Sequence, residues 1–232
     1  MGIKDKRLSD IVDPIFIEMM KRVGPYSMHA NNGDIENIYA WYRDIHYILK
    51  YNIPGAIVEC GVWRGGMMML AALIGEEVGE RRDLWLYDTF AGVTEPTIED
   101  GFEVNRTYHY WKSKGDAWGF GGSMGKVSKN MGKTGYQGWV GYVKGDVLET
   151  IPKSVPNEIA ALRIDVDLYR PTKHCLEHLY PLLSVGGVLV LDDYGCFDGA
   201  RQAVDDYIEK SDLQLLLSRV GRTVYEATKQ KA

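Results

Sequence analysis

The sequence contains few cysteines and no apolar run long enough to cross a bilayer. Three of the 232 residues are cysteine, and Cys60, Cys175 and Cys196 lack metal-ligand spacing. We therefore expect reduced thiols rather than disulfides or a thiolate metal site. A membrane helix needs about 20 consecutive apolar residues, and Asp10 and Asp13 interrupt the N-terminal stretch that could form a signal-peptide core. These absences predict a soluble, cytoplasmic protein without membrane contact.

Positive charge is also scarce. The chain has 27 Lys and Arg against 32 Asp and Glu, a net charge of -5, and no evident basic patch. Nucleic acid is therefore not an expected partner. The composition, 45% hydrophobic and 25% charged, is that of a globular protein. The length suits one α/β domain with an appended lid rather than two complete domains.

From residue 56 onward, short apolar strands alternate with helices. The predicted strands cover residues 56–60, 84–88, 141–144, 159–165, 187–191, 213–217 and 223–227. The predicted helices cover residues 66–78, 123–133, 170–183 and 199–210, and two more at 7–22 and 34–50 precede the first strand. This alternation predicts an α/β fold with a mostly parallel seven-stranded sheet, helices on both faces and an N-terminal helical lid.

One segment, residues 94–142, breaks the alternation. It is rich in glycine and contains several aromatic residues, such as Tyr108 and Trp118. A connection of this length is typical of a functional or disordered loop, and the aromatic residues favour a functional one. We predict a loop at the mouth of the binding site. The expected division is a lid and substrate region at 1–54 and a core at 55–232 that carries this insertion.

A glycine-rich turn follows the first predicted strand. Residues 59–66 read Glu-Cys-Gly-Val-Trp-Arg-Gly-Gly and lack the G-x-G-x-x-G spacing of dinucleotide-binding proteins. Glycines allow a ligand to approach the backbone, and the N-terminus of the next helix offers free N–H groups. An acid before the glycines suits a cationic amine, such as the methionine end of S-adenosylmethionine. A tight turn without a ligand would also explain the pattern.

Carboxylates follow three of the predicted strands. Asp88 ends the second strand, where an acid can accept hydrogen bonds from a ribose diol or simply cap the next segment. Two pairs of aspartates, Asp165 with Asp167 and Asp192 with Asp193, follow two later strands. Because the carboxyl ends of parallel strands meet at one edge of a sheet, we expect these four carboxylates to converge.

Four converging carboxylates repel one another unless a cation neutralises them. An all-oxygen set suits a hard cation such as Mg²⁺. A bound cation would lower the pKa of a coordinated hydroxyl and orient it for attack on a methyl group. The alternative is that Asp192 and Asp193 cap a loop while Asp167 is only solvated.

Four sequence strings together resemble the macrocin O-methyltransferase family. These strings are residues 57–66, 87–92, 162–169 and 192–195, and the resemblance extends from Tyr26 to Tyr207. The family methylates sugar hydroxyls of macrolides and other glycosylated natural products with Mg²⁺. The resemblance therefore implies a Rossmann-like class I methyltransferase fold and S-adenosylmethionine-dependent, Mg²⁺-dependent O-methylation of a sugar or glycosylated natural product. The implied partner is a small-molecule acceptor, and we expect a homo-oligomer.

The resemblance also implies roles for single residues. The implied cofactor-binding residues are Met28, Glu59, Gly61, Asp88, Ser123 and Asp165. The implied metal ligands are Asp165, Asp192 and Asp193. The implied catalytic residues are Asp165 and Asp167, with Asp167 as the general base. Apart from the resemblance, His109 in the aromatic insertion is the next candidate for that role.

Two other functions remain open from the sequence. A catechol-type, metal-dependent O-methyltransferase has a similar arrangement of acids, but carries Asp-Asn where this chain has Asp192-Asp193. A non-catalytic nucleoside-binding domain would keep the glycines but has no need for every acid at the sheet edge. Methylation of a glycoside, of a catechol or of neither distinguishes the three functions.

Overall fold

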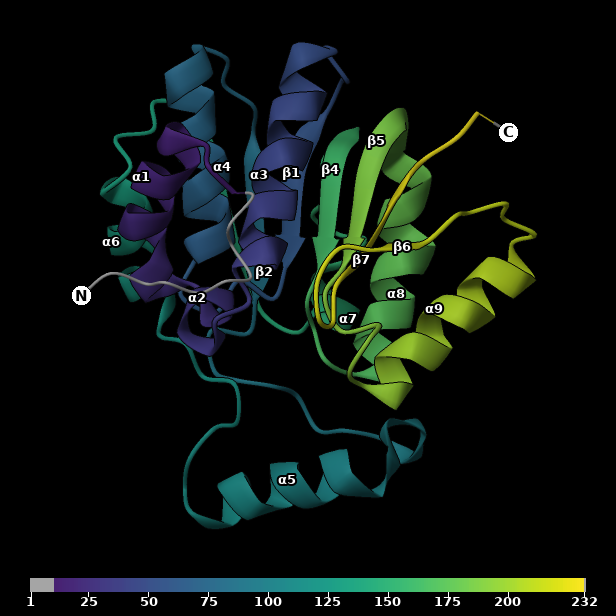
Figure 1. Cartoon of the computed structure of the whole chain (residues 1–232). Coiled ribbons are helices and arrows are strands. Elements are labelled where there is room, and N and C mark those ends of the chain that lie inside the picture. Colours follow the sequence, from purple (N-terminus) through teal and green to yellow (C-terminus); the bar gives the residue numbers. More distant parts are fainter. Residues whose placement is uncertain (1–10, 232) are drawn as a thin grey trace.

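A seven-stranded sheet forms the centre of the protein (Figure 1), whose computed structural model describes residues 11–231. The strands are β1 (Ala56–Cys60), β2 (Leu84–Asp88), β3 (Val140–Lys144), β4 (Ile159–Ile164), β5 (Leu183–Leu191), β6 (Ser218–Arg219) and β7 (Tyr225–Thr228). Their order is β3-β2-β1-β4-β5-β7-β6, with β7 antiparallel to both neighbours and the other pairs parallel. The predicted Rossmann-like α/β fold is confirmed.

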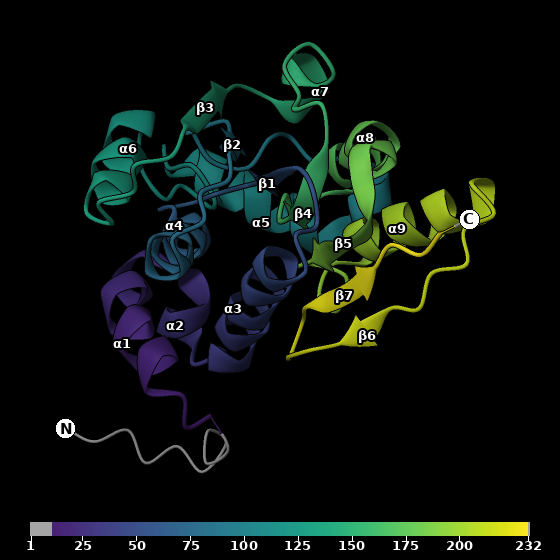
Figure 2. The same cartoon turned by 90° about the horizontal axis from the view of Figure 1, so that it is seen from above.

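Helices cover both faces of this sheet. The helices of the described residues are α1 (Pro14–Val23), α2 (Met28–Asn32), α3 (Ile35–Lys50), α4 (Gly66–Val78), α5 (Gly101–Ser113), α6 (Met124–Gly132), α7 (Val147–Thr150), α8 (Tyr169–Leu179) and α9 (Asp198–Lys210), of which α5 lies apart from the sheet. One apolar core joins α1, α3, α4 and α6 to one face, and a second core joins α7, α8 and α9 to the other (Figure 2). No helix within residues 11–231 is both long and apolar enough to cross a membrane.

The strand order fixes where a ligand can bind. The chain moves outward from β1 to β2 and β3 and then returns to β4 on the other side of β1. In open α/β sheets, the crevice beyond the carboxyl ends of the strands at such a reversal is the usual ligand site. The register pairs Glu59 of β1 with Arg163 of β4. Two oppositely charged side chains therefore lie beside each other near this reversal.

The N-terminal helices pack on α4. Asp13 caps α1, because its Oδ1 accepts hydrogen bonds from the backbone N–H groups of Ile15 and Phe16. The predicted helix 7–22 therefore begins later than expected, while residues 7–10 lie outside the described residues. A Cβ on Gly66 would lie 2.5 Å from the carbonyl oxygen of Tyr26. Glycine at this position thus allows the chain before α2 to lie directly against the start of α4.

The predicted loop at 94–142 is only partly a loop, because besides α6, which the helix predicted at 123–133 anticipates, it contains the unpredicted 13-residue helix α5. Helix α5 stands away from the sheet, and none of its residues is buried (Figure 1). The turn before it is fixed to the body by Asp100, whose Oδ1 accepts a hydrogen bond from the backbone N–H of Tyr169 at 2.6 Å. A helix that buries no face lacks the apolar periodicity by which sequence predicts a helix.

The predicted strand at 213–217 is wrong. Leu213, Leu215 and Leu217 pack against the second apolar core, which produces their alternating pattern. Their backbone has no partner strand, since β6 comprises only Ser218 and Arg219, which pair with β7. Residues 213–217 therefore show the alternating burial of a strand without pairing in the sheet, which is why the sequence pattern predicts a strand here.

Candidate active site

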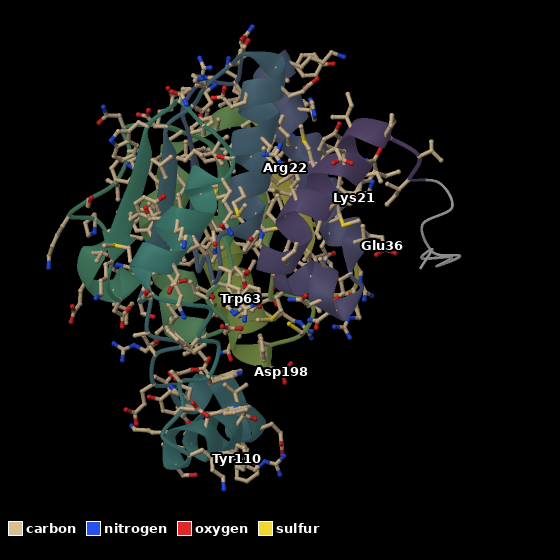
Figure 3. The ribbon with its side chains drawn as sticks, turned by 90° about the vertical axis from the view of Figure 1, so that its left-hand side faces the viewer. Lys21, Arg22, Glu36, Trp63, Tyr110 and Asp198 are labelled. Carbon is tan, nitrogen blue, oxygen red and sulfur yellow. The ribbon has the colours of Figure 1, made fainter. Side chains whose placement is uncertain are left out.

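A cavity of about 400 Å³ lies at the carboxyl ends of β1, β2, β4 and β5. The N-terminal segment 26–34 lines one side of it, and both arms of the insertion, at residues 92–94 and 118–119, line another. Figure 3 shows Trp63, which also lines the cavity, at the end of the body that faces α5. Because both of these segments line the cavity, the insertion has the position at the mouth of the site that the sequence predicts.

Asp88 holds the glycine-rich turn in place. Its Oδ2 accepts hydrogen bonds from the backbone N–H groups of Val62 at 2.9 Å and Trp63 at 3.1 Å, and its Oδ1 accepts one from Phe90 at 2.6 Å. Trp63 and Phe90 both have the left-handed backbone conformation. The Thr89 hydroxyl lies 3.5 Å from the same Oδ1 but donates at 2.6 Å to the carbonyl oxygen of Gly92. About three of the four acceptor sites of this carboxylate are therefore in use within the protein.

Gly61 allows β1 and β4 to meet at their ends. Its φ is +85°, and a Cβ there would lie 1.7 Å from the carbonyl oxygen of Asp165. No residue with a side chain fits without moving one strand. The turn after β1 and the first acid after β4 are consequently in direct backbone contact.

Glu59 is buried, and only one of its two carboxyl oxygens has a hydrogen-bond partner among the described residues. Its side chain is 1% exposed, and its Oε1 accepts a hydrogen bond from Nη1 of Arg163 at 2.7 Å. Its Oε2 is buried and has no hydrogen-bond partner among the described residues. Burial raises the pKa of Glu59 to about 8, against the opposing effect of Arg163. An unpartnered acceptor on the cavity wall is suited to a ligand that donates hydrogen bonds, such as an ammonium group.

Arg163 connects three of the acids. Its guanidinium donates from Nη1 to Glu59 and, at 2.7 Å, to Oδ2 of Asp165, and from Nη2 to Oδ1 of Asp192. Arg163 is not among the site residues predicted from the sequence. The signal was nevertheless present, because a lone arginine within an apolar strand is buried and must be paired.

Three aspartates offer oxygens that lie within 4.8 Å of one another, and these are Asp165, Asp167 and Asp193. Asp193 is held by the backbone N–H of Asp167, which donates to its Oδ2 at 2.9 Å. Asp167 has a φ of +63°, in the left-handed region. Of the expected metal ligands, Asp165 and Asp193 therefore lie close together, while Asp192 is directed toward Arg163. The third carboxylate of the cluster is that of Asp167.

The charges of this group are poorly balanced without a cation. Burial, followed by the neighbouring carboxylates, raises the pKa of Asp167 to about 8 and that of Asp193 above its usual range. Burial and Asp192 raise the pKa of Asp165 to about 6 despite Arg163. Burial would also raise the pKa of Asp192, but Arg163 and His29 outweigh it and lower that pKa to about 2. A cation beside Asp165, Asp167 and Asp193 would relieve their repulsion, so these residues fit a hard metal ion.

The other predicted site residues are less central. Met28 lines the cavity but is largely exposed. Ser123 occupies the N-cap position of α6 and does not line the cavity. His109 lies exposed on α5, also outside the cavity lining.

Comparisons with known proteins all identify O-methyltransferases as similar to this chain. A family model described as Macrocin-O-methyltransferase (TylF) matches residues 36–225. A demethyldecarbamoylnovobiocin O-methyltransferase from Streptomyces niveus is 32% identical over 196 residues, which are 81% of this chain and 70% of that protein. A mycinamicin III 3''-O-methyltransferase from Micromonospora griseorubida is 32% identical over 206 residues, 86% of this chain and 79% of that protein.

The fold comparison gives the same result. The solved structure of the O-methyltransferase NovP superposes on this chain with a TM-score of 0.76 at 29% identity. The match covers 85% of this chain and 81% of that one.

Proposed function

Because this chain belongs to the macrocin O-methyltransferase family, we propose that it transfers the methyl group of S-adenosylmethionine to a hydroxyl of a sugar on a glycosylated natural product. The family establishes an O-methyltransferase that uses S-adenosylmethionine. The sugar acceptor is inferred from the relatives, whose names specify mycinamicin III and demethyldecarbamoylnovobiocin as substrates. One cavity contains both the glycine-rich turn and the acids after β4 and β5, so methyl donor and acceptor can meet there.

We assign the cofactor to the β1 and β2 side of the cavity. The free Oε2 of Glu59 is suited to the ammonium group of the methionine part. Gly61 holds the turn after β1 directly against the backbone of Asp165, and Asp88 at the cavity wall can accept a hydrogen bond from a ribose hydroxyl. The expected contact of Ser123 has no support from the cavity lining.

Mg²⁺ is the proposed metal. We propose Asp165, Asp193 and the unbonded Oδ2 of Asp192 as its ligands, because hard cations prefer carboxylate oxygens. When bound, Mg²⁺ supplies positive charge that stabilises a developing alkoxide. Asp167 is the competing third ligand, since its oxygen already lies with those of Asp165 and Asp193.

Asp167 is the proposed general base. A sugar hydroxyl is a weak nucleophile while it keeps its proton, and a base with a pKa near the working pH transfers that proton most efficiently. The pKa of about 8 at Asp167 meets this condition. As the hydroxyl oxygen bonds to the methyl carbon, the carbon–sulfur bond breaks, S-adenosylhomocysteine leaves and the proton passes to the Asp167 carboxylate.

Labelled S-adenosylmethionine tests the proposal. The purified protein is incubated with a deoxysugar glycoside, its sugar-free aglycone and catechol, each with Mg²⁺ or with excess chelator. We expect label only on the glycoside and only without chelator. Methylated catechol with an unlabelled glycoside would favour the catechol-type enzyme, and cofactor binding without any transfer would favour a nucleoside-binding domain. Transfer at full rate under chelation would refute the metal assignment.

We also propose a homo-oligomer. Phe102 and Tyr110 project from α5 and are largely exposed, which is unusual for aromatic residues on a helix that stands apart from its own core. Light scattering after gel filtration measures the mass. A mass equal to one chain of 26.2 kDa would refute the proposal.

A further inference from the structure

The N-terminal segment reaches the acids through one buried side chain. His29 of α2 is 8% exposed. Its Nε2 lies 2.9 Å from Oδ1 of Asp192 and 2.9 Å from Nη2 of Arg163, and its Nδ1 lies 3.2 Å from the side-chain nitrogen of Asn37. Asn37 belongs to α3, so the imidazole joins two N-terminal helices to the loop after β5.

Oδ1 of Asp192 can only accept, so His29 with a hydrogen on Nε2 donates to it. In that tautomer Nδ1 accepts from the side-chain nitrogen of Asn37. That N–H donates to Asp192, whose Oδ1 also accepts from Arg163. One oxygen of Asp192 is thus held by two donors from different parts of the chain. None of the described residues donates to its Oδ2.

The position of His29 depends on the whole N-terminal segment. The backbone of Tyr26 rests on Gly66, and Asp34 pairs with Arg222 at 3.3 Å. These contacts fix the segment at both ends of the short helix that carries His29. If the segment moves away, the donor to Asp192 moves with it.

We propose that His29 is a positioning residue: when residues 24–34 are packed against the body, its imidazole holds the Asp192 side chain in one orientation. It touches neither cofactor nor acceptor in this role. By holding Oδ1, it leaves Oδ2 as the oxygen that Asp192 can present to a cation. The inference rests on the proposed metal-dependent function, but the contact between His29 and Asp192 can be measured without methyl transfer.

Two substitutions distinguish the hydrogen bond that His29 donates to Asp192 from the packing of its imidazole ring. In His29→Gln, the side-chain nitrogen can occupy nearly the place of Nε2 and donate to Asp192. In His29→Asn, the shorter side chain cannot reach Asp192 but can stay beside Asn37. His174→Gln is the matched control, because His174 bonds only to the carbonyl oxygen of Ile151 and lies outside the cavity lining.

The first measurement is Mg²⁺ affinity of the folded protein by calorimetry, with neither cofactor nor acceptor present. Loss of a residue that orients a metal ligand typically weakens metal binding about 10–100-fold. We expect a loss of about ten-fold in His29→Asn, recovery of most of the affinity in His29→Gln and no change in His174→Gln. Unchanged affinity in His29→Asn would overturn the proposal, since a merely structural role predicts a lower melting temperature alone.

The second measurement is hydrogen exchange of residues 24–34 without metal, in a double-mutant cycle of His29→Asn and Asp192→Ala, which removes the accepting oxygen. Each single variant should speed exchange about ten-fold, and the double variant should be no faster than either one. Additive effects would show that the residues act independently and would overturn the proposal. If the parent bound no Mg²⁺, the metal function would fail, and this cycle alone would decide the role of His29.

Discussion

Replacement of Arg163 by methionine is expected to be the most damaging conservative change in the core. The substitution keeps most of the side-chain volume and removes the only cation that contacts Glu59, Asp165 and Asp192 among the described residues. Breaking a buried ion pair by removing one partner costs about 3–5 kcal/mol. For a protein of this size, about 1 kcal/mol lowers the melting temperature by roughly 2–4 °C. We therefore expect the melting temperature at pH 7 to fall by about 6–20 °C.

The effect of pH on this variant has a definite sign. In the parent, the lowered pKa of Asp192, about 2, means that its contribution to stability is present above its unfolded pKa and is lost as the pH falls through about 2. Without Arg163, the acids can be accommodated only when protonated. The loss of melting temperature should therefore be largest near pH 7 and smaller near pH 4.5, which lies below the pKa of about 6 at Asp165, so that this acid is already protonated.

Thermal unfolding followed by circular dichroism at the two pH values measures this difference. Arg106→Met is the control, because Arg106 is exposed on α5 and pairs only with Glu103 within the same helix, and such pairs contribute little to stability. A loss below about 3 °C in Arg163→Met, or a deficit equal at both pH values, would show that Arg163 does not neutralise the acids.

Four further results are expected. Asp88→Ala should weaken S-adenosylmethionine binding about ten-fold or more by calorimetry, because hydrogen bonds to a charged acceptor are worth about 1.5–3 kcal/mol each; unchanged affinity would remove the ribose assignment. Asp192→Asn should weaken Mg²⁺ binding and regain part of its turnover at high Mg²⁺. Asp167→Asn should keep Mg²⁺ affinity and lose about 10²–10⁴ in turnover, and the reverse result would exchange the two roles. Because Asp167, as the proposed base, must be unprotonated and its pKa is raised to about 8, turnover should rise with pH, with a midpoint that moves lower as Mg²⁺ increases; a midpoint independent of Mg²⁺ would place the base elsewhere.

The sequence predicts the elements around the glycine-rich turn well. The bounds of β1, α4 and β2 agree with the predicted ranges, because buried strands and a helix between two glycines give strong local signals. Gly65 and Gly79 both have the left-handed conformation at the ends of α4. Local chemistry alone determines these boundaries.

The direction of the Asp192 side chain could not be predicted in the same way. Two adjacent aspartates after one strand look equivalent in sequence, yet Oδ1 of Asp192 bonds to Arg163 and His29 while Asp193 bonds to the backbone of Asp167. The difference depends on partners 29 and 163 residues away in the chain for Asp192. Only the folded arrangement of strands and lid decides it.

The contact between Gly61 and Asp165 has a consequence for how this enzyme can change. Because the backbone at the proposed cofactor site touches the backbone beside the acids, the proposed donor and acceptor sites share one rigid frame. A shift that enlarged one side would misplace the other. New acceptors are therefore more readily accommodated by exchange of residues in the insertion, whose helix α5 buries nothing, while the frame that aligns oxygen, carbon and sulfur stays as it is.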